Sequence, residues 1–357
     1  MVDVRKPETD VADRLKKIPG YQPGMPAHRM DEVTFMDELE LMWGRKWGAQ
    51  SSIGELRTVL VHRPRQEGLR DEDLADPNFF VNFGRPGDIP KWDKRLKQHD
   101  DMVAALRSEG VEVIHTDYTP EKRKGIYASE AGGLGLEPII IRGGAIIHRA
   151  AIASKRGAER WITEFLAKLG CPILFTVHGK AIHEVRGNIL FLDPEHCIQA
   201  TSVRSNMEGV RQVEPVLREA GVKEIHVAHS PSYLNSMHRF GAAMGFHIVN
   251  VLNMVDEKLA VCYPGALPYD TLAYLRRLGL RLIEIPEEEA VNQAGNTFCI
   301  RPGVTLMAAG NPVTTAALRR EGVRVIEIDL SESAPFGSGP LCQIGPLVRD
   351  DGPYLNS

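Results

Sequence analysis

The sequence predicts an α/β fold in which five ββαβ units close into a ring, a propeller with five-fold pseudosymmetry. Two observations indicate this. The order strand, turn, strand, helix, strand recurs along the chain, and the segments that end the units resemble one another, as in GVEVIHT, LRLIEIP and VRVIEID. One such unit cannot bury its own apolar faces, so neighbouring units must pack around a shared axis. The alternative is an open α/β sheet in two domains.

The same sequence patterns predict the strands and helices of each unit. Short polar or Gly/Pro turns separate the first two strands, apolar residues at helical spacing follow, and a glycine often precedes the last strand. The predicted elements of the five units, in order, are Leu56–His62, His99–Glu109 and Val111–His115; Pro138–Ile141, Ala145–His148, Gly157–Leu169 and Pro172–Phe175; Ile189–Leu192, Cys197–Thr201, Glu208–Ala220 and Val222–Ala228; Asn250–Val255, Leu259–Cys262, Tyr269–Leu278 and Leu280–Ile285; and Thr297–Ile300, Val304–Ala308, Val313–Glu321 and Gly322–Ile328. Residues 1–50 are predicted to be an irregular N-terminal leader with one amphipathic helix within Phe35–Trp47, and residues 51–357 a single domain.

Composition excludes several classes of function. Lys and Arg total 43 and Asp and Glu 47, a net charge of -4, which argues against a nucleic-acid partner. No apolar run reaches transmembrane length, and the N-terminus lacks the apolar core of a signal peptide. The five cysteines are scattered, with no CxxC pair, so we expect a reducing cytoplasm and no metal site. Because no nucleotide or metal motif occurs, no cofactor is expected.

One cysteine stands apart from the others. Cys342 lies in a Gly/Ser/Pro-rich segment, Phe336–Leu347, which reads as a loop, whereas the remaining cysteines fall in apolar surroundings typical of buried residues. A thiol among free backbone amides can act as a nucleophile, although a free surface thiol fits equally well. A nucleophilic cysteine needs an acid/base partner, and His238 and His247 are both candidates by position.

Polar residues also precede the first strand of several units. They are Glu137, Asn188, His247 and Asn296. In a ring of repeats, equivalent positions converge on the axis, so these side chains are predicted to share a pocket. For Glu137 and Asn188 the alternative is loop capping.

The order of several short motifs resembles the pentein superfamily, which includes arginine deiminase, dimethylarginine dimethylaminohydrolase and the amidinotransferases. The resemblance extends over Ser51–Asp350. The motifs that carry it are Val203–Asn206 with Gly209, His247 with Asn253–Val255 and Leu259–Val261, Ala309–Pro312, and Gly337–Cys342. It implies a pentein fold and a catalytic domain over residues 51–357.

The resemblance also implies roles for individual residues. Cys342 corresponds to the nucleophile and His247 to the general acid/base. The substrate-binding residues that it implies are Glu137, Asn188, Glu184, Arg204, Asn296 and Gly339. Three acidic positions that grip a guanidinium in arginine-using members are Val185, Val203 and Val249 here, although Glu184 is next to the first. Loss of these carboxylates removes the charge-assisted hydrogen bonds that a cationic substrate needs.

We therefore expect a cofactor-independent cysteine hydrolase that forms a covalent intermediate on Cys342 and cleaves a C–N bond of a small amidine-like, guanidine-like or azole compound. The alternatives are a nitrohydrolase that releases nitrite from a 2-nitroimidazole-type compound, an amidinotransferase, and a non-catalytic binding protein of the same fold. The expected partner is a small-molecule substrate, and a homo-oligomer is compatible with the sequence.

Overall fold

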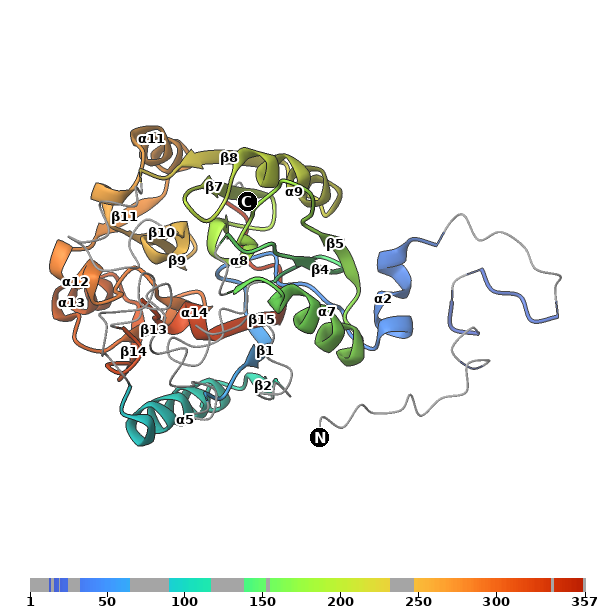
Figure 1. The fold of residues 1–357 in the computed structure, drawn as a ribbon, viewed down its shortest axis with the longest axis horizontal. Helices are drawn as coiled ribbons and strands as arrows, with labels where there is room; N and C mark the ends of the chain where they lie inside the picture. The colour runs from blue at the N-terminus through green and yellow to red at the C-terminus, as the bar shows by residue number, and fades with distance from the viewer. Residues whose placement is uncertain are drawn as a thin grey trace.

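Five three-stranded sheets surround a common axis in the computed structural model of the protein (Figure 1). The structure describes residues 13, 16–18, 20–24, 33–64, 90–116, 138–151, 155–231, 247–334 and 337–355. The predicted α/β propeller of five units is confirmed.

Four of the sheets follow the chain order of the predicted units. Their strands, from the axis outward, are β3 (Ile139–Ile141), β4 (Gly144–Ile147) and β5 (Ile173–Thr176); β6 (Ile189–Phe191), β7 (His196–Thr201) and β8 (Glu224–His229); β9 (Leu252–Asp256), β10 (Leu259–Cys262) and β11 (Arg281–Glu284); and β12 (Phe298–Arg301), β13 (Val304–Ala308) and β14 (Arg324–Ile328). The inner and middle strands pair antiparallel as a hairpin, and the middle and closing strands pair parallel. A parallel pair needs a crossover, and a helix supplies each one on the outside of the ring (Figure 1): α7 (Ala158–Leu169), α9 (Met207–Glu219), α11 (Tyr269–Arg277) and α13 (Pro312–Arg320).

The first sheet is built from both ends of this series. Its middle and closing strands are β1 (Leu56–Val61) and β2 (Glu112–His115), connected through α5 (Trp92–Ser108), and its inner strand is β15 (Ile344–Arg349). β15 pairs antiparallel with β1, from Leu56 opposite Arg349 to Val61 opposite Ile344. The prediction of a loop over Phe336–Leu347 was therefore wrong from Pro340 onward, where a helical turn over Pro340–Gln343, which contains Cys342, leads directly into β15. Gly345 and Pro346 interrupt the apolar pattern there, but the partner strand β1 imposes the extended conformation.

Burial differs between inner and closing strands, and this explains their sequences. β3, β6 and most of β9 and β12 are buried, whereas β2, β5 and β11 are exposed or half-buried along their length. An inner strand is covered by its neighbours around the axis and so reads as a continuous apolar run. A closing strand is covered mainly by its helix, so polar residues alternate with apolar ones.

A helix before the first sheet packs against the second unit. α2 (Phe35–Trp43) begins at a capping box, in which Thr34 and Asp37 satisfy each other's backbone N–H groups, and it ends at Gly44. Leu39 on this helix and the following Trp47 are each 1% exposed and pack in one cluster with α7. The predicted helix within Phe35–Trp47 is thus confirmed for the first nine residues of that range.

The remaining short helices are α8 (Val185–Asn188), the 3₁₀ turns η5 (Ile248–Asn250) and η6 (Pro264–Ala266), α12 (Glu287–Val291) and α14 (Pro340–Gln343). Except for η6, they lie on segments that lead into inner strands. Asn250, predicted as the first residue of a strand, ends η5 instead.

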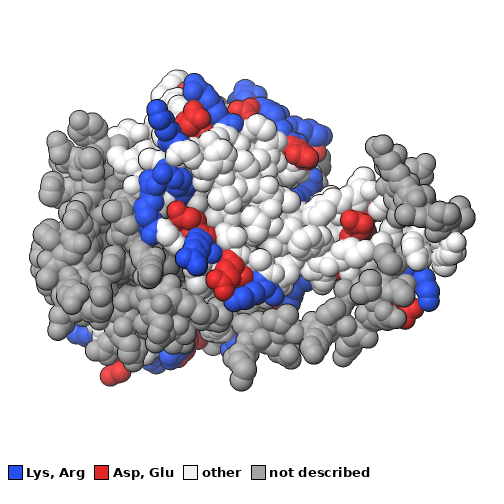
Figure 2. Space-filling view, turned by 45° about the vertical axis from the view of Figure 1, so that its right-hand side comes forward, with Lys and Arg blue, Asp and Glu red and all other residues white. Residues whose placement is uncertain are grey.

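No helix in the described ranges combines the length and apolar composition that crossing a bilayer requires. Figure 2 shows an uncharged face with acidic and basic side chains mixed along its edges, so neither sign of charge dominates this side.

The segment leading to Asn296 is anchored by one carboxylate. Glu289 of α12 is 7% exposed and accepts hydrogen bonds from the backbone N–H groups of Val313 (2.7 Å) and Thr314 (2.8 Å), at the start of α13. We predict that Glu289→Ala lowers the free energy of unfolding by about 1–2 kcal/mol, as for loss of a helix cap. Urea unfolding measures this, with Glu288→Ala, at an exposed position of the same helix, as the control. Equal effects of the two substitutions would contradict the anchoring role.

Candidate active site

The candidate site residues share one position in the architecture. Asn188 immediately precedes β6, His247 precedes η5 and β9, Asn296 lies two residues before β12, and Cys342 lies two residues before β15. Because the inner strands are related by the pseudosymmetry of the ring, their starting ends meet at one end of the axis. Glu137, predicted to belong to the same set, lies outside the described residues.

Cys342 is held by Asn296 of the fifth unit, which in turn binds Asn250 of the fourth. The Asn296 side-chain N–H donates to Cys342 Sγ at 3.0 Å, and the Cys342 backbone N–H donates to Asn296 Oδ1 at 3.3 Å. Asn250 Oδ1 accepts from Asn296 Nδ2 at 2.7 Å and lies 3.9 Å from Cys342 Sγ. An amide N–H directed at sulfur favours the charged thiolate, because hydrogen bonds to the charged form of an acid stabilise it.

The other four cysteines have a different environment. All are buried, while Cys342 is partly exposed. Burial raises the pKa of the Cys171, Cys262 and Cys299 thiols to about 12, and it raises the pKa of Cys197 as well. A thiolate is the nucleophilic form, so these four are unsuited to attack on a substrate at neutral pH.

His247 lies against a fully buried carboxylate. Its Nε2 is 2.7 Å from Glu184 Oε2, and the Glu184 side chain is 0% exposed. Lys155 Nζ lies 3.7 Å and Arg204 Nη1 3.5 Å from the same carboxylate, which also accepts the Ala151 backbone N–H at 3.2 Å. Burial alone would raise the pKa of Glu184, but Lys155, Arg204 and His247 outweigh it and hold the pKa well below its usual range. The carboxylate is therefore charged, and it fixes the orientation of the imidazole ring.

Two glycines permit these contacts. A Cβ at Gly187 would lie 2.4 Å from the His247 ring, and a Cβ at Gly339 would lie 2.6 Å from Asn296 Oδ1. Any larger residue would displace the general acid/base candidate or the asparagine that holds Cys342. The structure thus places Gly339 next to Asn296, the residue that binds Cys342.

Asn188 is fully buried, and its side-chain N–H donates to Ser205 Oγ at 3.0 Å. Its Oδ1 has no hydrogen-bond partner among the described residues. A buried polar atom without a partner is rare in folded proteins, so this oxygen is a candidate acceptor for a substrate N–H.

The contacts join four units of the ring in sequence. Glu184 of the third unit binds His247 of the fourth, Asn250 of the fourth binds Asn296 of the fifth, and Asn296 binds Cys342 of the first sheet. Asn253 reinforces the path by donating from one amide to the carbonyls of Val249 and Gly295, both at 2.6 Å.

Sequence reasoning missed part of this network. The sequence predicts a strand residue at Asn250 and substrate contacts for Glu184 and Arg204, and it gives no signal for Lys155. In the structure Glu184 is engaged by His247, and Arg204 faces Glu184. The signal available for Asn250 was its place three residues after His247. Within the described residues no cluster of three or more His, Cys, Asp or Glu side chains has the geometry to hold a metal ion.

The sequence is similar to a family model and to a curated enzyme. The family model for arginine deiminase matches residues 270–349, which include Asn296 and Cys342. The 2-nitroimidazole nitrohydrolase of Mycobacterium sp. (strain JS330) is 26% identical over 378 residues, covering 99% of this chain and 97% of that protein.

Two solved structures have the same fold as this chain. Dimethylarginine dimethylaminohydrolase from Pseudomonas aeruginosa, in complex with citrulline, aligns with a TM-score of 0.63 at 21% identity, over 82% of this chain and 100% of that one. The N-terminal domain of ArgZ, an arginine dihydrolase of cyanobacteria, aligns with a TM-score of 0.67 at 15% identity, over 84% and 100%. Five ββαβ units around one axis give the chain the fold of these structures, and its sequence is similar to members of the pentein superfamily.

Proposed function

We propose that the protein is a cofactor-independent cysteine hydrolase that cleaves a C–N bond of a small, neutral, nitrogen-rich compound. Cys342 is the nucleophile and His247 the general acid/base. The observation that carries this proposal is the path of contacts from Glu184 through His247, Asn250 and Asn296 to Cys342. Residues 51–357 form the catalytic unit in this proposal, and residues 1–50 are a leader to it.

The charges around His247 favour a neutral substrate. The Glu184 carboxylate is already engaged by His247, Lys155 and Arg204, so it is not available to pair with a guanidinium. Val185 and Val249 are buried in the core, and Val203 is half-buried. None of the three can supply the carboxylate that would offset the desolvation of a cation.

A 2-nitroazole is the substrate class that fits best. It is neutral, and its C2 carbon is electron-poor. The alignment with a 2-nitroimidazole nitrohydrolase over nearly the whole of both chains supports this choice. Asn188 Oδ1 offers an unused acceptor for the ring N–H.

The proposed reaction has two steps. The Cys342 thiolate attacks C2, an S–C bond forms, and the C–N bond to the nitro group breaks, with its electron pair leaving as nitrite. His247 then takes a proton from water, the hydroxide attacks C2, and the S–C bond breaks, which returns the electron pair to sulfur. The net change is replacement of the nitro group by hydroxyl, with release of nitrite and one proton. Nitrite needs no protonation to leave, so His247 acts mainly in the second step.

Hydrolysis of an amidine or guanidine is the second candidate. The match of the arginine deiminase model over residues 270–349 favours it, because this range contains Cys342 and the asparagine that binds it. In that reaction His247 would have to protonate a departing amine, since an amine leaves poorly as an anion.

The nucleophile is tested by substitution. We predict that Cys342→Ser abolishes nitrite release from 2-nitroimidazole and leaves the melting temperature unchanged, because the hydroxyl is a far weaker nucleophile at neutral pH. The control is Cys262→Ala, at a buried cysteine, which should retain turnover per folded molecule. Intact-mass measurement with a slow substrate should find the covalent adduct on Cys342. Turnover by the serine variant, or an adduct on another cysteine, would overturn the assignment.

The substrate charge is tested by steady-state kinetics. We predict that kcat/KM for 2-nitroimidazole exceeds that for arginine by at least about 10–100-fold, the effect of one missing charge-assisted hydrogen bond. Val203→Glu should improve arginine turnover relative to Val203→Gln, which has the same shape without the charge. Efficient arginine turnover by the unmodified protein would favour the second candidate.

The buried carboxylate predicts a pH dependence of stability. A carboxyl group whose pKa is lowered by folding stabilises the protein above its unfolded pKa, near 4.3, and this contribution is lost as the pH falls through the folded pKa. Glu184→Gln removes the buried negative charge that Lys155, Arg204 and His247 face, so we predict a loss of about 3 kcal/mol at pH 7.

The difference between the protein and this variant should shrink as the pH is lowered from 5 toward 3, because the unfolded chain takes up a proton at Glu184 in this range while the folded protein holds the carboxylate charged. Urea unfolding across this range measures it, with Glu208→Gln at an exposed site as the control. A difference that does not depend on pH would show that the charge of Glu184 contributes nothing.

A further inference from the structure

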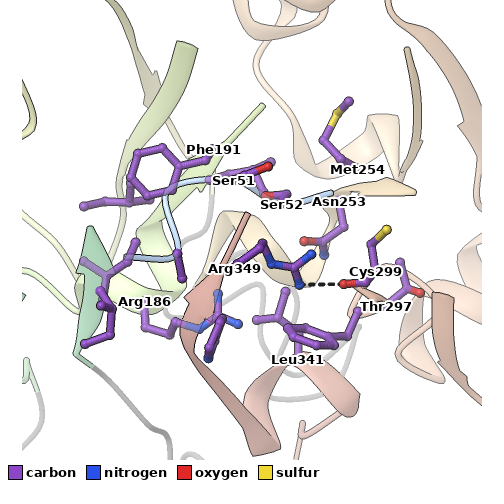
Figure 3. A pocket seen from close by; sticks show the side chains of 17 residues that line it. Ser51, Ser52, Arg186, Phe191, Asn253, Met254, Thr297, Cys299, Leu341 and Arg349 are labelled. Carbon is purple, nitrogen blue, oxygen red and sulfur yellow. Dashed lines mark hydrogen bonds between the residues drawn. The ribbon is translucent and has the colours of Figure 1, made fainter. Parts of the chain in front are cut away.

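A pocket lies on the axis of the ring, beyond the catalytic residues. It has a volume of about 40 Å³, and all five inner strands contribute to it (Figure 3). Its lining includes Arg186, Phe298, Cys299, Leu341 and Arg349. Cys342, His247 and Glu184 do not line it, so this axial pocket is distinct from the candidate active site.

Arg349 places a positive charge on the wall of the axial pocket. The residue is 5% exposed. Its Nη1 donates to the Gly54 carbonyl and its Nη2 to the Cys299 carbonyl at 2.6 Å, while its Nε has no hydrogen-bond partner among the described residues. Its guanidinium carbon lies 5.4 Å from the centre of the Phe298 ring.

These partners are all uncharged. The adjacent carboxylate, Asp350, is committed to the exposed Arg57 at 2.6 Å. Burial lowers the pKa of Arg349 to about 10, which still leaves the group charged at neutral pH. Asp350 favours the charged form of Arg349, but no ion pair joins Arg349 to a carboxylate among the described residues. A buried charge without a close counter-charge is costly, so a negative partner in contact with the guanidinium would stabilise the site.

A second guanidinium reaches the same pocket from the active-site end. Arg186 belongs to α8, next to Glu184, and donates to the carbonyl of Ile344, the first residue of β15. Figure 3 shows the guanidinium groups of Arg186 and Arg349 directed into the space between the inner strands. Among the described residues that line the axial pocket there are two arginines and no carboxylate.

We propose that the axial pocket binds one small monovalent anion of the halide class, held between Arg186 and Arg349. The volume limits the choice, since a pocket of this size holds a few water molecules or one small ion, but not a large organic anion. Apolar walls such as Leu341 and Phe298 favour a weakly hydrated ion over a strongly hydrated one. The bound ion offsets the buried charge and thereby stabilises the ring where its inner strands meet.

Thermal unfolding tests the proposal without any measurement of turnover. Sodium chloride is titrated into protein in sodium gluconate at constant ionic strength, because gluconate is too large for the axial pocket. The melting temperature should rise by a few degrees and saturate, as for a ligand that binds only the folded state. Arg349→Gln should lose this response, and Arg281→Gln, which removes an exposed positive charge on β11, should keep it.

Crystals of the unmodified protein soaked in sodium bromide give a second readout, which does not depend on the folding of a variant. Anomalous scattering should place bromide in the axial pocket, between Arg186 and Arg349. Coincident melting temperatures in chloride and gluconate would overturn the proposal, as would bromide bound elsewhere but not on the axis. Bromide in the pocket without a chloride effect in solution would mean binding at crystal concentration only, and would also count against it.

Discussion

The pairing of β15 with β1 is the contact on which the rest of the molecule depends. Four sheets are made from consecutive segments, but the first sheet has no inner strand until the segment Ile344–Arg349 returns to it. This pairing completes the ring of five three-stranded sheets and covers the edge of β1 that would otherwise face the axis. It also carries Cys342 to the end of the axis at which the inner strands begin. The same pairing therefore completes the ring and positions Cys342, the proposed nucleophile.

The same geometry distributes the chemistry over several units. No unit holds both Cys342 and His247, and each is positioned by a side chain of its neighbour, Asn296 and Glu184 respectively. The path tolerates little change, because Gly187 and Gly339 are in contact with its members and leave no space for a side chain. The axial pocket extends this arrangement, since Arg186 lies next to Glu184 in the chain and lines a pocket that all five inner strands share.

Much of the fold could be predicted from the sequence, because inner strands read as apolar runs and closing strands alternate. The exception was β15. Gly345 and Pro346 interrupt its apolar pattern, and its extended conformation depends on pairing with β1. For the site, the cysteine loop and His247 could be proposed from the sequence and from family resemblance. The contact between Glu184 and His247 could not be predicted from the sequence, because the packing of the third unit against the fourth brings the two side chains together. The hydrogen bond between Asn250 and Asn296 could not be predicted either, because Asn250 lies in η5 and not at the start of a strand.

Closure by the last inner strand has a consequence for biosynthesis. Ribosomes make the chain from its N-terminus, so β1 emerges long before β15, and the units between them can fold first. Cys342, the proposed nucleophile, lies only two residues ahead of the strand that completes the ring. A nascent chain therefore acquires this thiol only when synthesis of the ring is almost finished, and a prematurely terminated product that lacks this segment has neither a closed ring nor the Cys342 thiol.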